Sequence, residues 1–596
     1  MKKQFGLPLM LASALAFSAC SSDDVAENGN GSLTDFTNGG YVKMAINMPT
    51  VKSSEGAFKG KNDDYQDGTS DEYAVNNTTV ILFQGNNEND AIFHSAYNIT
   101  KSWNLATTPN GQISSTLQLT KKVNEAAIGS NLYALVVVNN NGLLSVGTDH
   151  KLTVNGGNFT GNFTDFKNEL ATAADVSSTK LSGAGLFMAN APLSKGIGGT
   201  AESGGPVTTL VNLTANVYPT DTEANNNPAA HIYIERGVAK VTFVNPKKDA
   251  KFTTDAFSNG KGVVPVTYTM DGWNLDITNT KSYLVRHVKS SWNAYQTDIN
   301  PTTGAIANPF RFVGHTAVKD DLYRTYWAED PNYSSTPAAA FNKVAGVDDI
   351  NKEFGSDKPL YCLENTFDVA NQNQDATTRA IVRVKVKING TEGDFYTVNG
   401  GKTTLYSQEN LDNLVKNAII TNSDVKAANG GTAPNAADIT LTYSTTPNTD
   451  GEVKVEGIDL TLAGGTALSA DAVKYNAILT AVNNTVKNIT KYVGGYVYYP
   501  VRIKHFGDEL TPWAQAYDSD ITTGVIYPAT KKEERYLGRY GVVRNNWYEL
   551  EVNKIKGIGY AVIPPSNKVP DDVLDQYISV KINILSWARR KQSEEL

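Results

Sequence analysis

The chain has 596 residues, which at roughly 150 residues per domain leaves room for two to four domains. Hydrophobic residues make up 40% and charged residues 19%, so the chain has enough apolar material for sizeable cores and is not a disordered tail protein. The formal net charge is −8, which argues against nucleic acid as a partner because cations are not in excess over anions. Abundant Tyr (29) and Gly (49) with scarce Met (6) and His (6) favour strands and turns over helix bundles.

The start of the chain has the pattern of an export signal. Two lysines precede an uncharged run from Phe5 to Ala19, which is shorter than the roughly 20 residues of a spanning helix but suits a signal-peptide core. We therefore expect residues 1–19 to be a signal peptide. The run Phe17-Ser18-Ala19-Cys20 resembles the lipobox of bacterial lipoproteins, in which the cysteine is acylated, although Phe17 stands where leucine is usual. The alternative is an ordinary cleavage site with an incidental cysteine.

Lipidation of Cys20 predicts attachment to a membrane through that lipid. Residues 20–40 then form a lipidated tether, because the Gly/Asn/Ser/Thr-rich composition from Asn28 to Asn38 is polar and turn-forming. The acidic run that follows Cys20 resembles the surface-export signal of Bacteroidota lipoproteins. No second apolar run of 18 or more residues occurs in the sequence, so the lipid alone would hold the protein at the membrane.

Catalytic and metal-binding motifs are missing from the sequence. The histidines occur without the spacing of a metal site, at positions 94, 150, 231, 287, 315 and 505. Neither a nucleophile elbow nor a phosphate-binding loop is present. Cys362 has no cysteine partner once Cys20 is acylated, and a lone cysteine among apolar residues is most often a small buried hydrophobe. We expect no enzyme activity, no cofactor and no metal ion.

The first predicted strand covers residues 41–49 and is followed by an unusual loop. Apolar side chains alternate on one face of this strand, as expected when one face is buried, and they are Val42, Met44, Ile46 and Met48. Residues 50–72 contain Gly, Ser, Asp and Lys with little apolar content, which predicts an exposed loop. Loops of this length inside a compact domain usually serve function or processing.

The remaining sequence predicts two β domains separated by a polar stretch at Pro219 to Ala230. Residues 73–228 contain β-branched or alternating runs with Asn/Gly turns, and one short helix capped by Thr164. Residues 229–562 begin with "HIYIERGVAKVTF", in which Gly237 is a candidate bulge. Two helices are expected in this domain. Ser407 caps the first, and Ser469 caps a longer one that ends at Gly494.

The C-terminal region carries a resemblance to a known family. "GGYVYYPVRIKHFGDE", "RYLGRYGVVRNNWYELEVNKIKGIG" and "DQYISVKINILSW" resemble the C-terminal region of the Bacteroidales fimbrillins, the subunits of type V pili. "YAVNNTTVILF", "LYALVVVNNN", "GLFMAN", "IERGVAKVTF" and "PLYCLENTF" extend the resemblance over nearly the whole chain, and the likeness is greatest to the major subunit of the minor (short) fimbria.

This resemblance implies a fold and an assembly mechanism. The fold would be mainly β, with two transthyretin-like β-sandwich domains and a few short helices, preceded by a lipoprotein signal peptide. A surface protease would cut after the first strand and release it, and the C-terminal strand of another subunit would fill the open groove. Physically this is β-augmentation, in which a strand adds backbone hydrogen bonds and restores a core.

The predicted C-terminal donor strand is patterned like the first strand. Residues 563–596 consist of a Pro-rich arm and this strand, whose inward side chains would be Ile578, Val580, Ile582 and Ile584. Both strands carry Lys and Asn on the opposite face. In the donor role the strand would hang from its own subunit by the arm. The alternative is that it pairs within its own domain.

The predicted processing loop departs from the family pattern, because family members are typically cut at arginine and no arginine occurs before Arg236. The candidate processing residues are Lys52, Lys59 and Lys61, which require a lysine-accepting protease. If none acts, the subunit would keep its first strand and serve only as a chain end.

The resulting hypothesis is a structural and adhesive subunit of a surface fimbria, located at the outer membrane and in the fimbrium. Its expected partners are other copies of itself, accessory and anchor fimbrillins, the maturation protease and host or bacterial receptors. Two alternatives remain open: a tip or anchor subunit of the same pilus, and a surface lipoprotein that binds glycans through exposed aromatic side chains and never polymerises.

Overall fold

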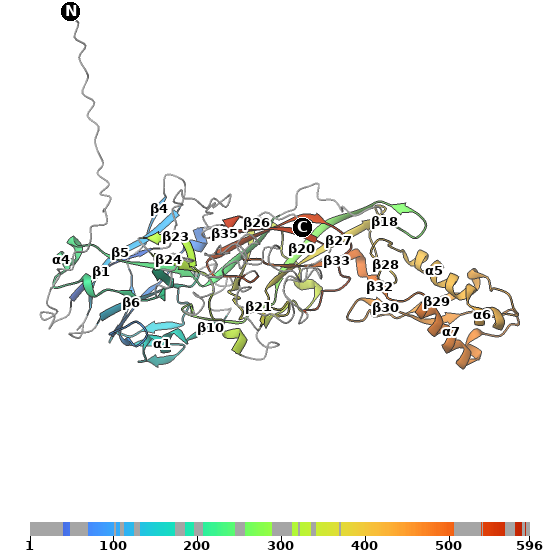
Figure 1. Ribbon diagram of the computed structural model, residues 1–596, viewed down its shortest axis with the longest axis horizontal. Coiled ribbons are helices and arrows are strands. Elements are labelled where there is room, and N and C mark those ends of the chain that lie inside the picture. Colours follow the sequence, from blue (N-terminus) through green and yellow to red (C-terminus); the bar gives the residue numbers. More distant parts are fainter. Residues whose placement is uncertain are drawn as a thin grey trace, which may run out of the picture.

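A computed structural model describes residues 40–47, 70–100, 103–107, 113–123, 131–172, 185–195, 207–244, 257–288, 313–319, 322–334, 341–368, 371–505, 538, 540–566, 578–586 and 590–591 (Figure 1). The chain is mainly β, as the sequence predicts. Cys20, Met48, Lys52, Lys59 and Lys61 lie outside the described residues. The molecule is elongated, with the first strands at one end, helices α5, α6 and α7 at the other, and the C-terminal strands between them (Figure 1).

The N-terminal part is built around one extended sheet and a large apolar core. The sequence "VILF" within β2 is apolar without alternation, and all four side chains are buried because both faces of this strand are covered. Phe83 shows how: its ring contacts Phe159, Phe163 and Phe166 edge-on. In sheet order the strands are β3 (Ile92–Ile99), β2 (Thr78–Gly85), β6 (Asn131–Val138), β11 (Met188–Asn190), β16 (Ala230–Arg236), β1 (Gly40–Asn47), β5 (Ile113–Val123) and β4 (Asn104–Thr107), with β14 (Val211–Asn212) beside β6 and β15 (Val217–Tyr218) beside β1.

Smaller elements surround this sheet. They are β7 (Leu144–Val146), β8 (Leu152–Val154), β9 (Gly157–Phe159), α1 (Phe163–Lys167), α4 (Asp221–Asn226), the pair β10 (Leu170–Thr172) and β22 (Lys281–Tyr283), and the sheet β13 (Val207–Thr208), β12 (Leu193–Lys195), β24 (Leu322–Thr325) and β23 (Val313–Lys319). The predicted cap Thr164 is wrong. Asn162 caps α1 instead, in a reciprocal capping box with Asp165.

The C-terminal part packs two sheets over a second core. Alternate residues of β17 and β34 point into it, such as Val241, Phe243 and Leu550, and they meet Val382 and Val384 of β27. One sheet contains β26 (Gly355–Leu363), β17 (Val238–Val244), β34 (Asn546–Ile555), β35 (Ile578–Ser586) and β36 (Arg590–Lys591), and the other contains β20 (Val266–Asp276), β27 (Arg379–Ile388) and β33 (Tyr496–Arg502). The pairs β18 (Phe257–Ser258) with β19 (Val263–Val264) and β21 (Thr278–Asn279) with β25 (Phe341–Asn342) lie beside them.

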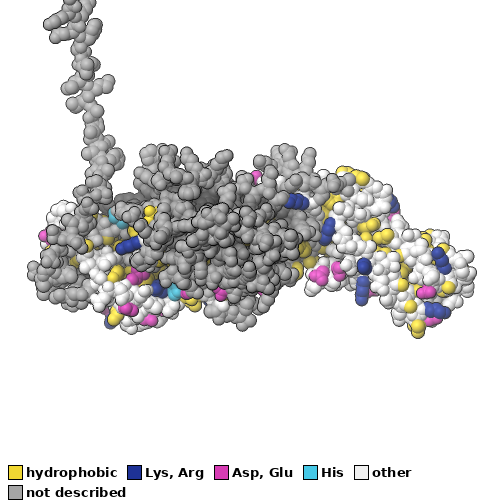
Figure 2. Space-filling model, viewed as in Figure 1, with side chains coloured by type: hydrophobic (Ala, Val, Ile, Leu, Met, Phe, Trp, Pro, Cys, Tyr) yellow, Lys and Arg dark blue, Asp and Glu magenta, His cyan; other side chains and the backbone are white. Residues whose placement is uncertain are grey.

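A third core lies in a lobe at the far end of the molecule (Figure 1). Ser407 caps α5 as predicted, because its side chain accepts a hydrogen bond from the backbone N–H of Asn410. Leu411 and Val415 of this helix are buried. The face in Figure 2 shows acidic and basic side chains interspersed on this lobe. Its elements are α5 (Gln408–Thr421), α6 (Ser423–Ala428), α7 (Ala472–Thr485), β28 (Phe395–Thr397), β29 (Thr440–Tyr443), β30 (Glu452–Val453), β31 (Val455–Asp459) and β32 (Ile489–Tyr492).

The predicted long helix after Ser469 is wrong at both ends. Asp471 caps α7 by accepting from the backbone N–H of Lys474, and the helix stops at Thr485. The segment predicted as its last turns is the strand β32, which pairs with β28 and β30. The β-branched Ile489 and Thr490 suit a strand, and pairing with distant segments overrides the helical spacing.

Gly237 separates two strands that the sequence reads as one. It lies between β16, which belongs to the N-terminal sheet, and β17, which belongs to the C-terminal sheet. Its backbone N–H donates to the carbonyl of Phe187 at 2.8 Å, and a Cβ atom at this position would lie 2.9 Å from the Phe187 ring. The chain thus passes from one core to the other at a position where a side chain would be crowded by Phe187.

We predict that Gly237→Ala lowers the free energy of unfolding by about 1 to 3 kcal/mol, because the added methyl group overpacks against Phe187 and the Phe187 backbone. Gly262→Ala is the matched control, since nothing lies within 4 Å of a Cβ there. Urea unfolding of the two variants measures the difference, and equal stabilities would contradict the assigned packing.

Candidate functional site

The first strand, β1, is an internal strand of the N-terminal sheet. Along one edge all eight residues pair antiparallel with β5, from Gly40 opposite Val123 to Asn47 opposite Thr116. Along the other edge the start of β1 pairs antiparallel with β15, and residues 44–47 pair parallel with β16. Removal of β1 would therefore open a groove with unpaired backbone groups on both sides.

The side chains of β1 complete the N-terminal core. Val42, Met44 and Ile46 are 0%, 1% and 0% exposed, which confirms the predicted inward face as far as the structure describes it. Ala45, which the alternation places on the outer face, is also buried. Helix α4 packs near this outer face, and Lys43 donates from Nζ to the carbonyl oxygens of Asn225 and Asn227 at 2.8 and 2.9 Å.

The predicted donor strand lies against its own domain in this structure. β35 pairs antiparallel with β34, from Ile578 opposite Ile555 to Ser586 opposite Asn546, and β36 pairs with its other edge. The expectation that the strand hangs free of its own subunit is wrong for this form of the protein. The inward assignment of Ile578, Val580, Ile582 and Ile584 stays a prediction, since the structure describes only the backbone of this strand.

The sequence prediction also misplaced the end of the processing loop. Residues 70–73 form a 3₁₀ helix rather than exposed loop, and the side chain of Glu72 is completely buried. A glutamate among Ser, Asp and Tyr carries no sequence signal for burial. Its partners lie in segments that are distant in the chain, which explains why the sequence pattern missed it.

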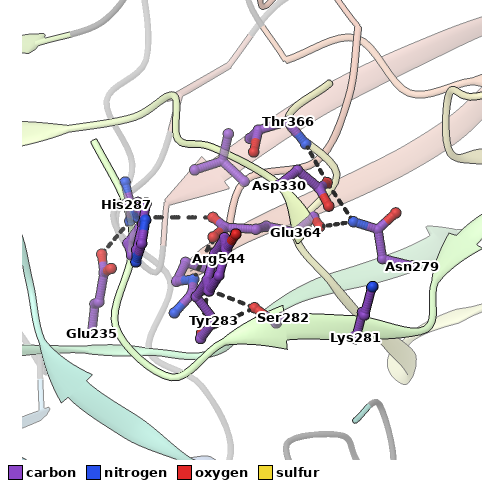
Figure 3. A network of polar contacts seen from close by, with 12 residues as sticks. Glu235, Asn279, Lys281, Ser282, Tyr283, His287, Asp330, Glu364, Thr366 and Arg544 are labelled. Carbon is purple, nitrogen blue, oxygen red and sulfur yellow. Dashed lines mark hydrogen bonds and ion pairs between the residues drawn. The ribbon is translucent and has the colours of Figure 1, made fainter. Parts of the chain in front are cut away.

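A buried network of charges joins the two domains (Figure 3). Arg286 pairs with Glu235 of β16 in the N-terminal sheet, and Arg544, just before β34, lies 2.7 Å from Glu364. Arg544 also donates to the hydroxyl of Ser282 at 2.7 Å, and all four charged side chains are at most 5% exposed. Charges buried this deeply are stable only when paired, so the network fixes the junction.

Burial raises the pKa of two carboxyl groups in this network. The pKa of Glu235 is raised by desolvation, which the neighbouring arginines oppose. Desolvation also raises the pKa of Asp330 from 3.8 to about 6, against hydrogen bonds from Asn332 and Asn279. The backbone N–H of Thr366 donates to the same carboxylate at 3.2 Å (Figure 3). Asp330 therefore gains a proton in the native state more readily than in the unfolded chain.

Metal ligation and cysteine chemistry find no support among the described residues. Within these ranges no group of three or more His, Cys, Asp or Glu side chains could hold a metal ion. Cys362 is buried, as predicted, and desolvation raises the pKa of its thiol to about 12, which keeps it protonated and unreactive. Among the described helices none is long and apolar enough to cross a membrane.

These observations define a β protein in which the first strand, β1, lies inside the N-terminal sheet. Strand β35, near the C-terminus, pairs with β34 in the C-terminal sheet. Comparison with known protein families gives a match in the C-terminal part of the chain. Residues 490–593 match the model of the C-terminal region of fimbrillin, the major fimbrial subunit protein type IV. This match confirms the resemblance to fimbrillins that the sequence predicts.

Solved structures of similar proteins come from Parabacteroides distasonis and Porphyromonas gingivalis. A putative cell adhesion protein from Parabacteroides distasonis is 12% identical, with 93% of this chain and 99% of that chain covered and a TM-score of 0.34. A fimbrilin from Porphyromonas gingivalis is 11% identical (92% and 99% covered, TM-score 0.36). A tip fimbrial protein from the same organism is 9% identical (92% and 100% covered, TM-score 0.29). No curated protein matches the chain.

We predict that Asp330 makes the stability of the protein depend on pH. Because its native pKa of about 6 exceeds the unfolded value, its contribution is complete below about pH 4 and is lost as the pH rises through 6. Relative to Asp330→Asn, the wild-type free energy of unfolding should fall by up to about 3 kcal/mol between pH 4 and pH 6.5. Urea unfolding at several pH values measures this. The exposed Asp348→Asn is the control, and parallel pH profiles for wild type and Asp330→Asn would contradict the assignment.

Proposed function

We propose that the chain is a structural subunit of a surface fimbria, exported as a lipoprotein and polymerised by strand exchange after its first strand is removed. The observation that carries this proposal is the position of β1, a terminal segment that fills the middle of a sheet. The fimbrillin match at residues 490–593 supports the same class of protein. Adhesion to host or bacterial receptors is part of this proposal.

The groove under β1 would bind a replacement strand strongly. Burial of an apolar side chain of this size is worth about 1.5 to 3 kcal/mol, so Val42, Met44 and Ile46 together account for about 4 to 9 kcal/mol before ordering costs. An empty groove exposes this core to water and leaves two sheet edges unpaired. A donor with apolar residues at alternate positions would recover both contributions.

Strand β35 would gain backbone pairing by moving from its own subunit into the open groove of another subunit. In its own subunit β35 pairs with β34 along its full length, and within the part of the chain that the structure describes, β36 covers two residues of its other edge. In the groove of another subunit it would lie between β5 on one side and β15 and β16 on the other. Strands β5 and β16 run in opposite directions, because β1 is antiparallel to β5 and parallel to β16. A donor strand placed between them would therefore be antiparallel to one and parallel to the other, whichever way it runs.

The two strands are also matched in length, with eight residues in β1 and nine in β35. While β1 is in place the groove is occupied, and β35 has no better position than β34. Cleavage at Lys52, Lys59 or Lys61 would thus control the start of assembly. Without cleavage the subunit would supply a donor strand but accept none, as a tip or anchor subunit could.

We predict that separate donor and acceptor variants assemble only with each other. The acceptor is the protein cleaved in the loop, freed of β1 and truncated after residue 574; the donor is the uncleaved full-length chain, whose groove is filled. Mixing them should give one-to-one complexes by size-exclusion chromatography with light scattering, since each supplies what the other lacks.

Each protein alone serves as a control and should stay monomeric. A donor carrying Ile582→Asp should not bind the acceptor, because the groove would have to bury an unpaired carboxylate. Polymerisation of the truncated acceptor by itself, or unchanged binding of the Ile582→Asp donor, would overturn the strand-exchange proposal.

We also predict that Cys20→Ala abolishes acylation and surface display. The acyl chain can only be attached to the thiol, and the mature chain has no other predicted membrane attachment. Metabolic labelling with a fatty-acid probe measures acylation, and Cys362→Ala is the matched control because that thiol is buried. Unchanged labelling of Cys20→Ala would contradict the lipoprotein assignment.

A further inference from the structure

The chain enters the folded core after the processing loop at a buried ion pair. In the 3₁₀ helix Ser70–Tyr73, the carboxylate of Glu72 lies 2.8 Å from Nζ of Lys240 and accepts a hydrogen bond from the hydroxyl of Tyr361. The backbone carbonyl of Glu72 accepts from Nε of Arg236 at 3.2 Å. The side chains of Glu72 and Lys240 are 0% and 2% exposed. We call Glu72, Lys240 and Tyr361 the junction latch.

The junction latch connects the entering segment to both domains. Lys240 belongs to β17 and Tyr361 to β26, two neighbouring strands of the C-terminal sheet, whereas Arg236 belongs to β16 of the N-terminal sheet. Nζ of Lys240 also lies 3.7 Å from the ring centre of Trp547 in β34. Burial lowers the pKa of Lys240, and Glu72 opposes this effect. Glu72 supplies a counter-charge 2.8 Å from this buried lysine, and loss of one partner of a buried ion pair is costly.

The residues that follow the latch are fixed by a second set of contacts. Asn139 donates from Nδ2 to the carbonyl of Ala74 at 2.7 Å and accepts from the backbone N–H of Asn76 at 2.8 Å. The backbone N–H of Asn140 donates to Oδ1 of Asn77 at 3.0 Å. These contacts lead directly into β2, and neither they nor the latch contacts involve β1. The segment should therefore stay in place when β1 leaves.

We propose that the junction latch sets the downstream limit of maturation cleavage and holds the new N-terminal end of the processed subunit at the junction of its two domains. Glu72 is a positioning residue in this proposal. By fixing residues 70–77, it keeps β2 and the adjoining sheet in place while the groove is empty. The inference rests on the proposed removal of β1, and it adds a defined boundary between the part that leaves and the part that remains.

Digestion of the full-length precursor with a glutamate-specific endopeptidase tests this boundary. Between β1 and β2 the chain contains two glutamates, Glu55 in the predicted processing loop and Glu72 in the latch. In the wild-type protein we expect cleavage after Glu55 and none after Glu72, with the new N-terminal residues identified by mass spectrometry. In Lys240→Met the cut after Glu72 should become at least about tenfold faster, because loss of the counter-charge releases the segment.

Lys151→Met is the matched control, since this lysine pairs with Asp149 on the surface and its side chain is 70% exposed. Its cleavage pattern should equal that of wild type. Tyr361→Phe removes only the hydroxyl donor to Glu72 and should give a smaller increase in the cut after Glu72. New cuts after the buried Glu235 and Glu364 would reveal that Lys240→Met unfolds as a whole. In that case the rate of cleavage after Glu72 in Tyr361→Phe tests the latch.

The two cleavage sites test the junction latch and the proposed processing loop independently. Equal rates after Glu72 in wild type, Lys240→Met and Tyr361→Phe would overturn the latch, whether the bond is cut in all three or in none. Absence of cleavage after Glu55 in every protein would instead contradict the exposed processing loop. In that case the cuts after Glu72 in the variants would still decide whether the latch exists.

Discussion

The pairing of β1 with β5 on one edge and with β15 and β16 on the other is the interaction on which the rest of the structure depends. It closes the N-terminal sheet and buries Val42, Met44 and Ile46 in the largest core. Yet this strand comes from the end of the chain and is followed by residues with the composition of an exposed loop. This strand, paired on both edges inside the sheet, is thus also one that a single cleavage could detach.

If β1 is removed as proposed, the rest of the fold must be held together elsewhere. The junction between the two domains meets this need with paired charges, Glu235 with Arg286 and Glu364 with Arg544, which are buried where the sheets meet. Buried ion pairs add little net stability compared with apolar packing, but they are costly to separate and specify one arrangement. Gly237 lets the chain pass from one sheet to the other at the same place.

Strand β35, near the C-terminus, also has a position in its sheet that bears on the proposed assembly. β35 has a full-length partner only in β34, so it forms part of a sheet without lying at its centre. Within the described ranges, β1 is thus paired along both edges, whereas β36 covers two residues of the second edge of β35. The proposed strand exchange would use both features.

Features that depend on residues close together in the chain could be predicted from the sequence. Alternation predicted the buried face of β1, Ser407 predicted the cap of α5, and the motifs after Gly494 predicted the fimbrillin resemblance. Only the tertiary structure decided that Ile489–Tyr492 is a strand, that Glu72 is buried and that β35 lies on β34. These depend on partners far away in the chain, such as Tyr361, which lies 289 residues from Glu72. Local periodicity carries no information about which distant segment supplies a hydrogen bond, a counter-charge or a strand edge, and that choice is made by packing of the whole chain.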